Sequence, residues 1–425
     1  MNRMHPSSLG GSVKAAASAV VIALLACGAA PAHAADAQGG IPGEWLMNYA
    51  GARTLGLGGA FVATADDALG ILWNPAGLQA MEQNQLMFEN VHLFEDTQMN
   101  SFGFALPGSR LPSFGLSIVS LQSGDFERTN ELNDNLGSFH EGETAYLFTM
   151  AKNLTPRLSL GTNFKLVQQT VEDFSSNGFG VDLGAIFQVT PNLRIGTTML
   201  NLAGPSIKLR DTPEAYPMQF RGGFALKVLN GRGLVSAQID KSSDASVALH
   251  AGTEYWLMPQ MALRAGYDDD RATGGLSYRF GPAYQIDYGV ADHPLGLSHR
   301  IGLSYRFGGF FASSQADPAV FSPTGEKATT KIQLNARSKA EVDTWTLELV
   351  NKSGNVVRKF GGPGAPPAHV LWDGKDETGM PVADGVYTYR LSVTDKAGRQ
   401  LASAIHRVEI STGGPQGSVP VTTVP

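Results

Sequence analysis

Two acidic stretches are the first residues in this sequence that could carry chemistry. Asp268-Asp269-Asp270 offers three carboxylates to a cation, but such a run is also typical of a solvated hairpin tip. Residues 373–379 resemble a calcium loop superficially, but they lack the spacing and the final glutamate of an EF-hand. We interpret both stretches as turns, and the sequence predicts no metal site and no cofactor.

Four arginines form a second set: Arg221, Arg264, Arg279 and Arg300. In the alternating pattern of its segment, each arginine lies on the same face as Gly and Ser residues. A polar lining of a barrel lumen would have this composition. Guanidinium groups favour carboxylates, so we expect lumen-facing arginines that attract carboxylate head groups or bind peptide backbone. No nucleophile elbow, phosphate loop or metal-spaced histidine pair is present, so no catalytic residue is predicted and the protein is expected not to be an enzyme. No basic stripe suggests nucleic acid.

A glycine-rich stretch, residues 51–78, is the third set. Gly56, Gly58 and Gly59 allow conformations and close approaches that other residues resist. Asp66 and Asp67 stand where a short helix could begin. Pro75 makes Asn74 extended, so this helix should end near Trp73. A compact segment ahead of a long strand array predicts a plug for a barrel.

The elements that must position these residues are strands, because apolar residues alternate with small or polar residues throughout 84–308. Between 158 and 166, Leu160 and Phe164 lie on one face, while Asn163 and Lys165 lie on the other. About fourteen such runs have lengths near the roughly 9–11 residues that cross a bilayer. The predicted fold is all-β, a transmembrane antiparallel β-barrel with an N-terminal lumenal hatch. A soluble sandwich or propeller is the alternative, and the arginine-rich faces argue against it.

The connections between these runs alternate in length, as in outer-membrane barrels. Tight turns are expected at 107–112, 153–156, 190–191, 229–232, 258–259 and 281–282. Longer loops are expected at 122–142, 170–177, 203–216 and 292–297, with short exceptions at 241–245 and 269–272. An even strand number puts both ends of the barrel on the periplasmic side.

The composition of the segments before and after these strands divides the rest of the chain into further regions. Residues 1–34 are interpreted as a signal peptide, with positive charge, an alanine-rich run and a small-x-small site. The single Cys27 lies within it, so we expect no disulfide. The predicted order continues with a hatch segment at 35–83, the barrel at 84–308, a linker at 309–319, an Ig-like β-sandwich at 320–411 and a disordered tail at 412–425.

The hatch motif also resembles a known family. Arg53, Gly56, Gly58, Gly59, Asp66 and Asp67, followed by Trp73, Asn74, Pro75 and Ala76, resemble the N-terminal signature of the FadL-like outer-membrane superfamily, most closely its PorV/PorQ-type branch. The resemblance implies a fourteen-stranded barrel with a lumenal hatch in the bacterial outer membrane. Its implied role is passage of hydrophobic molecules or service to a type IX secretion system.

The C-terminal unit is similar to the Ig-like domain of flagellar hook-capping proteins, on the evidence of Trp372-Asp373-Gly374 and Tyr387-Thr388-Tyr389. The leading hypothesis is therefore a transport or secretion barrel whose partners are outer-membrane lipid and either hydrophobic small molecules or secreted cargo and secretion-machinery proteins. In the expected mechanism, the Gly56–Gly59 segment flexes while Asn74-Pro75 anchors the hatch segment against the barrel wall. The alternatives are a barrel that only anchors a structural or adhesive Ig-like domain, and a soluble export-pathway cargo.

Overall fold

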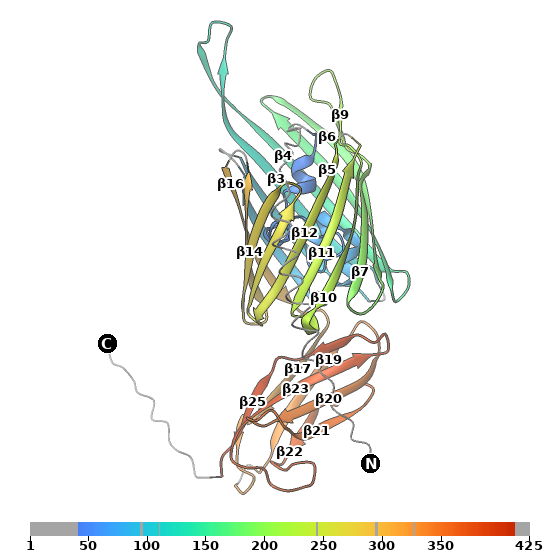
Figure 1. Cartoon of the computed structure of the whole chain (residues 1–425), viewed down its shortest axis with the longest axis vertical. Helices are drawn as coiled ribbons and strands as arrows, with labels where there is room; N and C mark the ends of the chain where they lie inside the picture. Colours follow the sequence, from blue (N-terminus) through green and yellow to red (C-terminus); the bar gives the residue numbers. More distant parts are fainter. Residues whose placement is uncertain are drawn as a thin grey trace, which may run out of the picture. The chain divides into compact units, whose positions relative to one another are not determined.

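A closed β-barrel and a separate β-sandwich make up the chain (Figure 1). The computed structural model describes residues 41–93, 97–109, 111–243, 245–293, 296–325 and 328–412. The predicted signal peptide, the first residues of the hatch segment and all but Thr412 of the predicted tail lie outside these ranges. Among the described residues, no helix is both long and apolar enough to cross a membrane.

Fourteen antiparallel strands form the barrel, as the sequence predicts, and β1 closes it by pairing with β16 from Asn84↔Phe307 to His92↔His299. The strands are β1 Asn84–His92, β2 Gln98–Leu106, β3 Ser113–Thr129, β4 Asn135–Asn153, β5 Leu158–Val171, β6 Phe174–Gln188, β7 Leu193–Ala203, β10 Gln219–Val228, β11 Gly233–Ser242, β12 Val247–Met258, β13 Met261–Asp268, β14 Arg271–Phe280, β15 Tyr284–His293 and β16 Gly296–Phe307. A short hairpin, β8 Ser206–Ile207 with β9 Glu214–Ala215, lies between β7 and β10.

The two ends of the barrel differ. We call the end where β1 begins and β16 finishes the turn end, and the opposite end the hairpin end, after the long β3–β4 hairpin that extends past the other strands (Figure 1). The prediction of a long loop at 122–142 is wrong, because most of these residues belong to the two strands of this hairpin. The loops predicted at 170–177 and 292–297 are also mostly strand. Hydropathy alternation fades where both faces of a strand are polar, so the sequence did not reveal these extensions.

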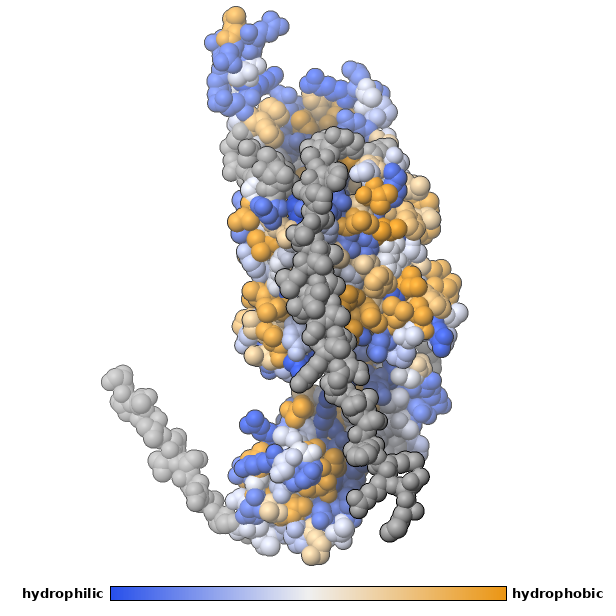
Figure 2. Space-filling model, in the orientation of Figure 1, coloured by the Kyte–Doolittle hydropathy of each residue, from blue (hydrophilic) through white to orange (hydrophobic). Residues whose placement is uncertain are grey.

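The barrel wall is apolar outside and polar inside. On β5, Leu160 and Phe164 are exposed, while Asn163 and Lys165 on the other face are buried in the lumen, which confirms the predicted faces. Hydrophobic side chains cover much of the wall, whereas the projecting hairpin is mostly hydrophilic (Figure 2). Large apolar side chains exposed on every side of a closed antiparallel barrel define a membrane-spanning barrel of the bacterial outer-membrane kind.

The N-terminal segment fills the lumen, and we call its described residues 41–80 the hatch. It contains four short helices: α2 Glu44–Asn48, α3 Ala52–Gly56, α4 Gly70–Trp73 and the 3₁₀ helix η1 Pro75–Gln79. Helix α4 ends at Trp73, as the proline predicts. It begins at Gly70 rather than at Asp66 or Asp67. Both carboxylates bind Arg53, and Asp67 Oδ1 also accepts from Leu69 N at 3.0 Å, just before the helix.

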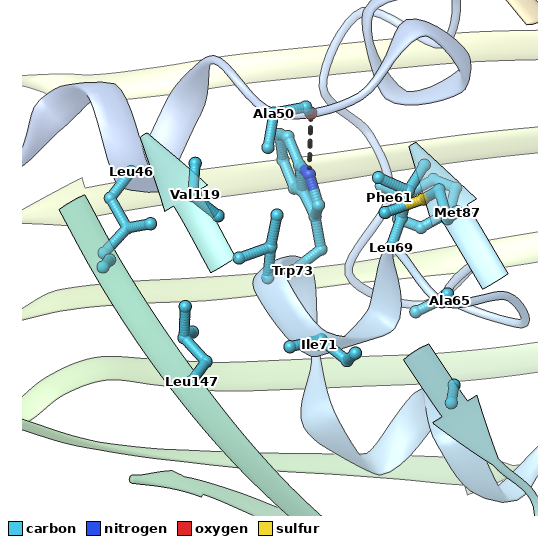
Figure 3. Packing of buried hydrophobic residues seen from close by; sticks show 14 of the residues in the cluster. Leu46, Ala50, Phe61, Ala65, Leu69, Ile71, Trp73, Met87, Val119 and Leu147 are labelled. Atoms are coloured by element: carbon cyan, nitrogen blue, oxygen red, sulfur yellow. Dashed lines mark hydrogen bonds between the residues drawn. The ribbon is translucent and has the colours of Figure 1, made fainter. Parts of the chain in front are cut away.

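The hatch has an apolar core that continues into the barrel wall (Figure 3). Trp73 is 3% exposed and packs edge-on against Phe61, with ring centroids 6.2 Å apart. Its indole Nε1 donates to the carbonyl of Ala50 at 3.1 Å. Strand residues such as Val119 and Leu147 cover the outer side of this cluster, so hatch and wall share one core.

The C-terminal unit is a β-sandwich with its own core. One sheet has the order β17-β19-β22, and the other has β18-β25-β23-β20-β21, with β24 paired to β23. The strands are β17 Phe311–Asp317, β18 Val320–Phe321, β19 Thr330–Arg337, β20 Val342–Val350, β21 Val356–Pro363, β22 His369–Trp372, β23 Gly385–Asp395, β24 Gln400–Ala402 and β25 His406–Ile410. Strand β17 replaces most of the linker predicted at 309–319, since its small residues, such as Ala312 and Ala316, give a weak alternation signal.

Candidate functional site

The candidate site is the contact between the hatch and the inner wall of the barrel. Lumen-facing glycines on many of the strands meet the hatch directly, and a Cβ added to any of them would lie 3.0 Å or less from a hatch atom. They are Gly115, Gly161, Gly184, Gly196, Gly223, Gly252, Gly266 and Gly289. We call this set the glycine ring. Glycine allows such close approach of two backbones, so the hatch is seated against the wall around the lumen.

Asn74 and Pro75 fit the wall between β6 and β7. The side-chain amide of Asn74 donates to the carbonyls of Val62 at 2.8 Å, Ala185 at 3.2 Å and Thr197 at 3.4 Å. Its Oδ1 accepts from Ala76 N at 3.1 Å, which caps η1. Asn74 is fully buried, so one side chain joins the hatch to itself and to two strands.

Arg53 is the centre of a charge network in the hatch. Its guanidinium lies 2.6 Å from Asp66, 2.7 Å from Asp67 and 3.1 Å from Glu254 of β12. The Arg53 side chain is 12% exposed and that of Glu254 6%. Removing one partner of a buried ion pair costs about 3–5 kcal/mol because the other charge stays buried. This network therefore fastens the hatch to the wall.

Gly56, Gly58 and Gly59 lie against β12–β14, whereas Asn74 lies against β6 and β7. Gly58 and Gly59 have φ of 60° and 79°, a region that favours glycine. Gly58 N lies close to Gly266, and the carbonyl of Gly58 meets His250 Nδ1 at 3.0 Å. The segment predicted to flex is thus packed tightly against the wall in this state.

Polar side chains of the strands bind the backbone of the hatch. Gln238 Oε1 accepts from Val62 N at 2.7 Å, and Glu89 Oε2 accepts from Ala52 N at 2.8 Å. Further contacts of this type come from Gln85 to Ala68 N, Asn163 to Ile71 O and Thr198 to Trp73 O. An irregular segment at membrane depth needs such partners for its backbone groups.

The four predicted arginines have different surroundings. Arg221 is fully buried, pairs with Asp240 at 3.1 Å and donates to Met47 O at 2.6 Å. Arg264 pairs with Glu254 at 2.7 Å and with Asp287 at 3.3 Å.

The other two lie apart from this pairing. Arg279 is only partly buried and stacks over the Trp256 ring, with its Cζ 3.7 Å from the centroid. Arg300 contacts Gly51 O at 3.5 Å. Arg221 and Arg264 are therefore occupied by internal acids and by the hatch, whereas Arg279 and Arg300 have no acidic partner within 4.0 Å among the described residues.

The hatch is also held at the hairpin end. Glu143 of β4 accepts from the indole of Trp45 at 2.6 Å and from the hydroxyl of Tyr216 at 2.7 Å. Trp45 belongs to α2, and Tyr216 belongs to the connection between β7 and β10. One carboxylate therefore ties the first helix of the hatch to an external connection.

Several residues that hold the hatch were not singled out from the sequence, notably Glu254, Gln238, Glu89 and Glu143. Glu254 shares its strand face with Gly252, and Gln238 shares its face with Ser236, so a polar side chain at such a position is a signal that could have found them. Glu89 and Glu143 instead share their faces with apolar residues, and there the acid among apolar residues is the signal. Within the described ranges, no group of three His, Cys, Asp or Glu side chains could hold a metal ion. Asp269 and Asp270 form the turn between β13 and β14, while Asp268 pairs with His250.

These features define the class: an outer-membrane β-barrel whose lumen is occupied by its own N-terminal segment, followed by an Ig-like domain. Two protein-family models match parts of the chain. The FlgD Ig-like domain matches residues 320–397, which confirms the resemblance to hook-capping proteins. The F plasmid transfer operon TraF protein family matches residues 163–278, within the barrel. No curated protein matches.

Solved structures of similar fold include the Pseudomonas putida toluene transporter TodX, with 14% identity and a TM-score of 0.47 over 60% of this chain and 97% of that one. The CymD monoaromatic hydrocarbon channel has 16% identity and a TM-score of 0.47 over 60% and 97% of the two chains. A Pseudomonas aeruginosa FadL homologue has 12% identity and a TM-score of 0.43 over 60% and 98%. The finer assignment to the PorV/PorQ-type branch stays a prediction.

Proposed function

We propose that this protein passes small hydrophobic molecules across the outer membrane, with the hatch as its gate. The observation that carries the proposal is a closed barrel whose lumen is filled by a segment joined to the wall by hydrogen bonds and ion pairs rather than by covalent bonds. A segment held in this way can shift without unfolding the strands. The turn end, where both barrel termini lie, is assigned to the periplasm.

A disulfide between hatch and wall tests whether the hatch moves. A Cβ at Gly115 of β3 would lie 2.8 Å from Cγ1 of Ile71 in α4, close enough for a disulfide in the double variant Ile71→Cys, Gly115→Cys. The only native cysteine, Cys27, is in the predicted signal peptide. Oxidised and reduced forms of one variant then differ only in the tether, which is a matched control for both substitutions.

The readout is uptake of radiolabelled toluene by cells that carry the protein in their outer membrane, against cells that lack it. We expect faster uptake with the wild type, loss of that gain when the variant is oxidised, and recovery after reduction. Equal uptake with and without wild-type protein contradicts the transport proposal. Equal uptake by the oxidised and reduced variant contradicts hatch movement.

A second proposal is that the barrel serves the Ig-like domain, either as an anchor or in type IX-like secretion with cargo and machinery proteins. It is supported by the complete sandwich core around Trp372, which needs no residue of the barrel, and by the resemblance of the hatch motif. Deleting residues 311–425 separates the two proposals. Toluene uptake that survives the deletion favours the channel, and uptake that is absent in both forms favours the anchor.

A further inference from the structure

A cavity of about 160 Å³ lies in the lumen near the hairpin end, bordered by the hatch on one side and by β10–β16 on the other. Glu44, Tyr49 and Trp73 line it from the hatch, and Gln219, Asp292 and Arg300 line it from the strands. One water needs roughly 10–15 Å³ of such volume, so the cavity holds on the order of ten waters or one small organic molecule.

Arg300 brings an unpaired positive charge to this cavity. It is 5% exposed, and its one hydrogen bond is a long contact of 3.5 Å to Gly51 O. Its Nε has no partner, and no carboxylate of the described residues lies within 4.0 Å of its guanidinium. Arg221 and Arg264, buried on the same wall, both have acidic partners. A buried guanidinium without an acid is complementary to the carboxylate of a ligand.

Unpaired acceptors line the same cavity. Gln219 is 5% exposed, and its Oε1 has no hydrogen-bond partner. Among the described residues, Glu44 forms no ion pair, so its carboxylate can accept from a positively charged ligand group. The hatch residues Tyr49 and Trp73 add an aromatic surface.

Most of the other charges around the cavity are paired with one another, and Asp269 accepts from the backbone N of Leu249. Asp268 lies 2.9 Å from His250 and 3.8 Å from Arg271, and Arg221 neutralises Asp240. The groups left for a ligand are therefore the guanidinium of Arg300 on β16 and, across the cavity, the oxygens of Glu44 in α2 and of Gln219 on β10.

We propose that this cavity binds a small zwitterion of the size of a free α-amino acid. Its carboxylate binds Arg300, and its ammonium group binds between Glu44 and Gln219. This site goes beyond the proposed passage of hydrophobic molecules, and direct binding in detergent solution tests it without any transport step.

Isothermal titration of the purified full chain with three probes tests the proposal. L-alanine carries both charges, propionate lacks the ammonium group, and ethylamine lacks the carboxylate. We expect alanine to bind at least about tenfold more tightly than either analogue, since each lost charge-assisted hydrogen bond is worth about 1.5–3 kcal/mol. No heat from alanine, or propionate binding as tightly as alanine, overturns the proposal.

Two variants assign the two charges. Arg300→Gln should weaken the binding of alanine and propionate about tenfold or more and leave that of ethylamine unchanged, whereas Glu44→Gln should weaken the binding of alanine and ethylamine. Arg232→Gln, an exposed arginine at the turn end, is the matched control. Heat-modifiable gel mobility verifies that each barrel is folded. Alanine binding that Arg300→Gln leaves unchanged in a folded barrel overturns the assignment.

Discussion

Arg53 of the hatch and Glu254 of β12 form an ion pair inside the barrel, with Nε 3.1 Å from Oε2. Glu254 also pairs with Arg264 at 2.7 Å, and Arg264 pairs in turn with Asp287. Arg53 of the hatch is thereby the last group in a row of alternating positive and negative side chains that runs along the inner wall. Such a row holds the hatch in one position and places each carboxylate in it next to a guanidinium.

Replacing Arg53 with alanine should release the hatch and leave the barrel intact. Asp66, Asp67 and Glu254 would lose their shared cation, at a cost of about 3–5 kcal/mol. We expect proteolysis within residues 41–80 to become at least tenfold faster, with heat-modifiable mobility retained. Arg128→Ala is the control, because its ion pair with Glu172 is largely exposed and worth at most about 1 kcal/mol. Equal protease resistance of both variants and the wild type would contradict the fastening role.

Gly252 and Gly274 allow a matched test of the glycine ring. A Cβ at Gly252 would collide with the backbone of Leu57, whereas the nearest atom to a Cβ at Gly274 is 3.9 Å away. Gly252→Ala should displace the hatch and lower the melting temperature, because two packed backbones must separate. Gly274→Ala should change it little. The two melting temperatures are measured by circular dichroism, and a similar small shift for both variants would show that the ring does not seat the hatch.

Trp372→Ala should unfold the sandwich alone. Trp372 is fully buried and meets Phe321 and Tyr387 edge-on, and its loss should cost about 3–5 kcal/mol. We expect rapid proteolysis between residues 311 and 412 with an intact barrel band on gels. The neighbouring Leu371→Ala is the control, since that side chain is 57% exposed. Protection of the sandwich in both variants, or loss of the barrel band with Trp372→Ala, contradicts an independent core.

The strands and their faces were predictable from sequence because the barrel separates two environments at every second residue. Leu160 meets lipid and Asn163 meets the lumen, so the alternation is strong wherever the strand crosses the membrane. The signal disappears in the β3–β4 hairpin, where both faces are polar, and in β17, where Ala312 and Ala316 replace large side chains.

The contents of the lumen were less predictable. Arg264 and Arg300 have the same pattern in sequence, but only Arg264 has acidic partners, and those come from β12 and β15. Similarly, Gly252 and Gly274 look alike until the path of the hatch is known. These differences depend on contacts between segments up to about two hundred residues apart, which periodicity does not report.

Asn74 gives the most direct test of the central claim that the hatch closes the lumen. Its amide bonds to Val62, Ala185 and Thr197 would be lost in Asn74→Ala, at a cost of about 1–3 kcal/mol for the buried carbonyls. The exposed Asn192→Ala, at the turn end, is the control.

The measurement is ionic conductance of the purified protein in planar lipid bilayers. The wild type and Asn192→Ala should stay closed, and Asn74→Ala should show repeated opening events. A wild-type protein that conducts steadily, or an Asn74→Ala variant that never opens, would contradict a hatch that is seated by Asn74 and closes the barrel.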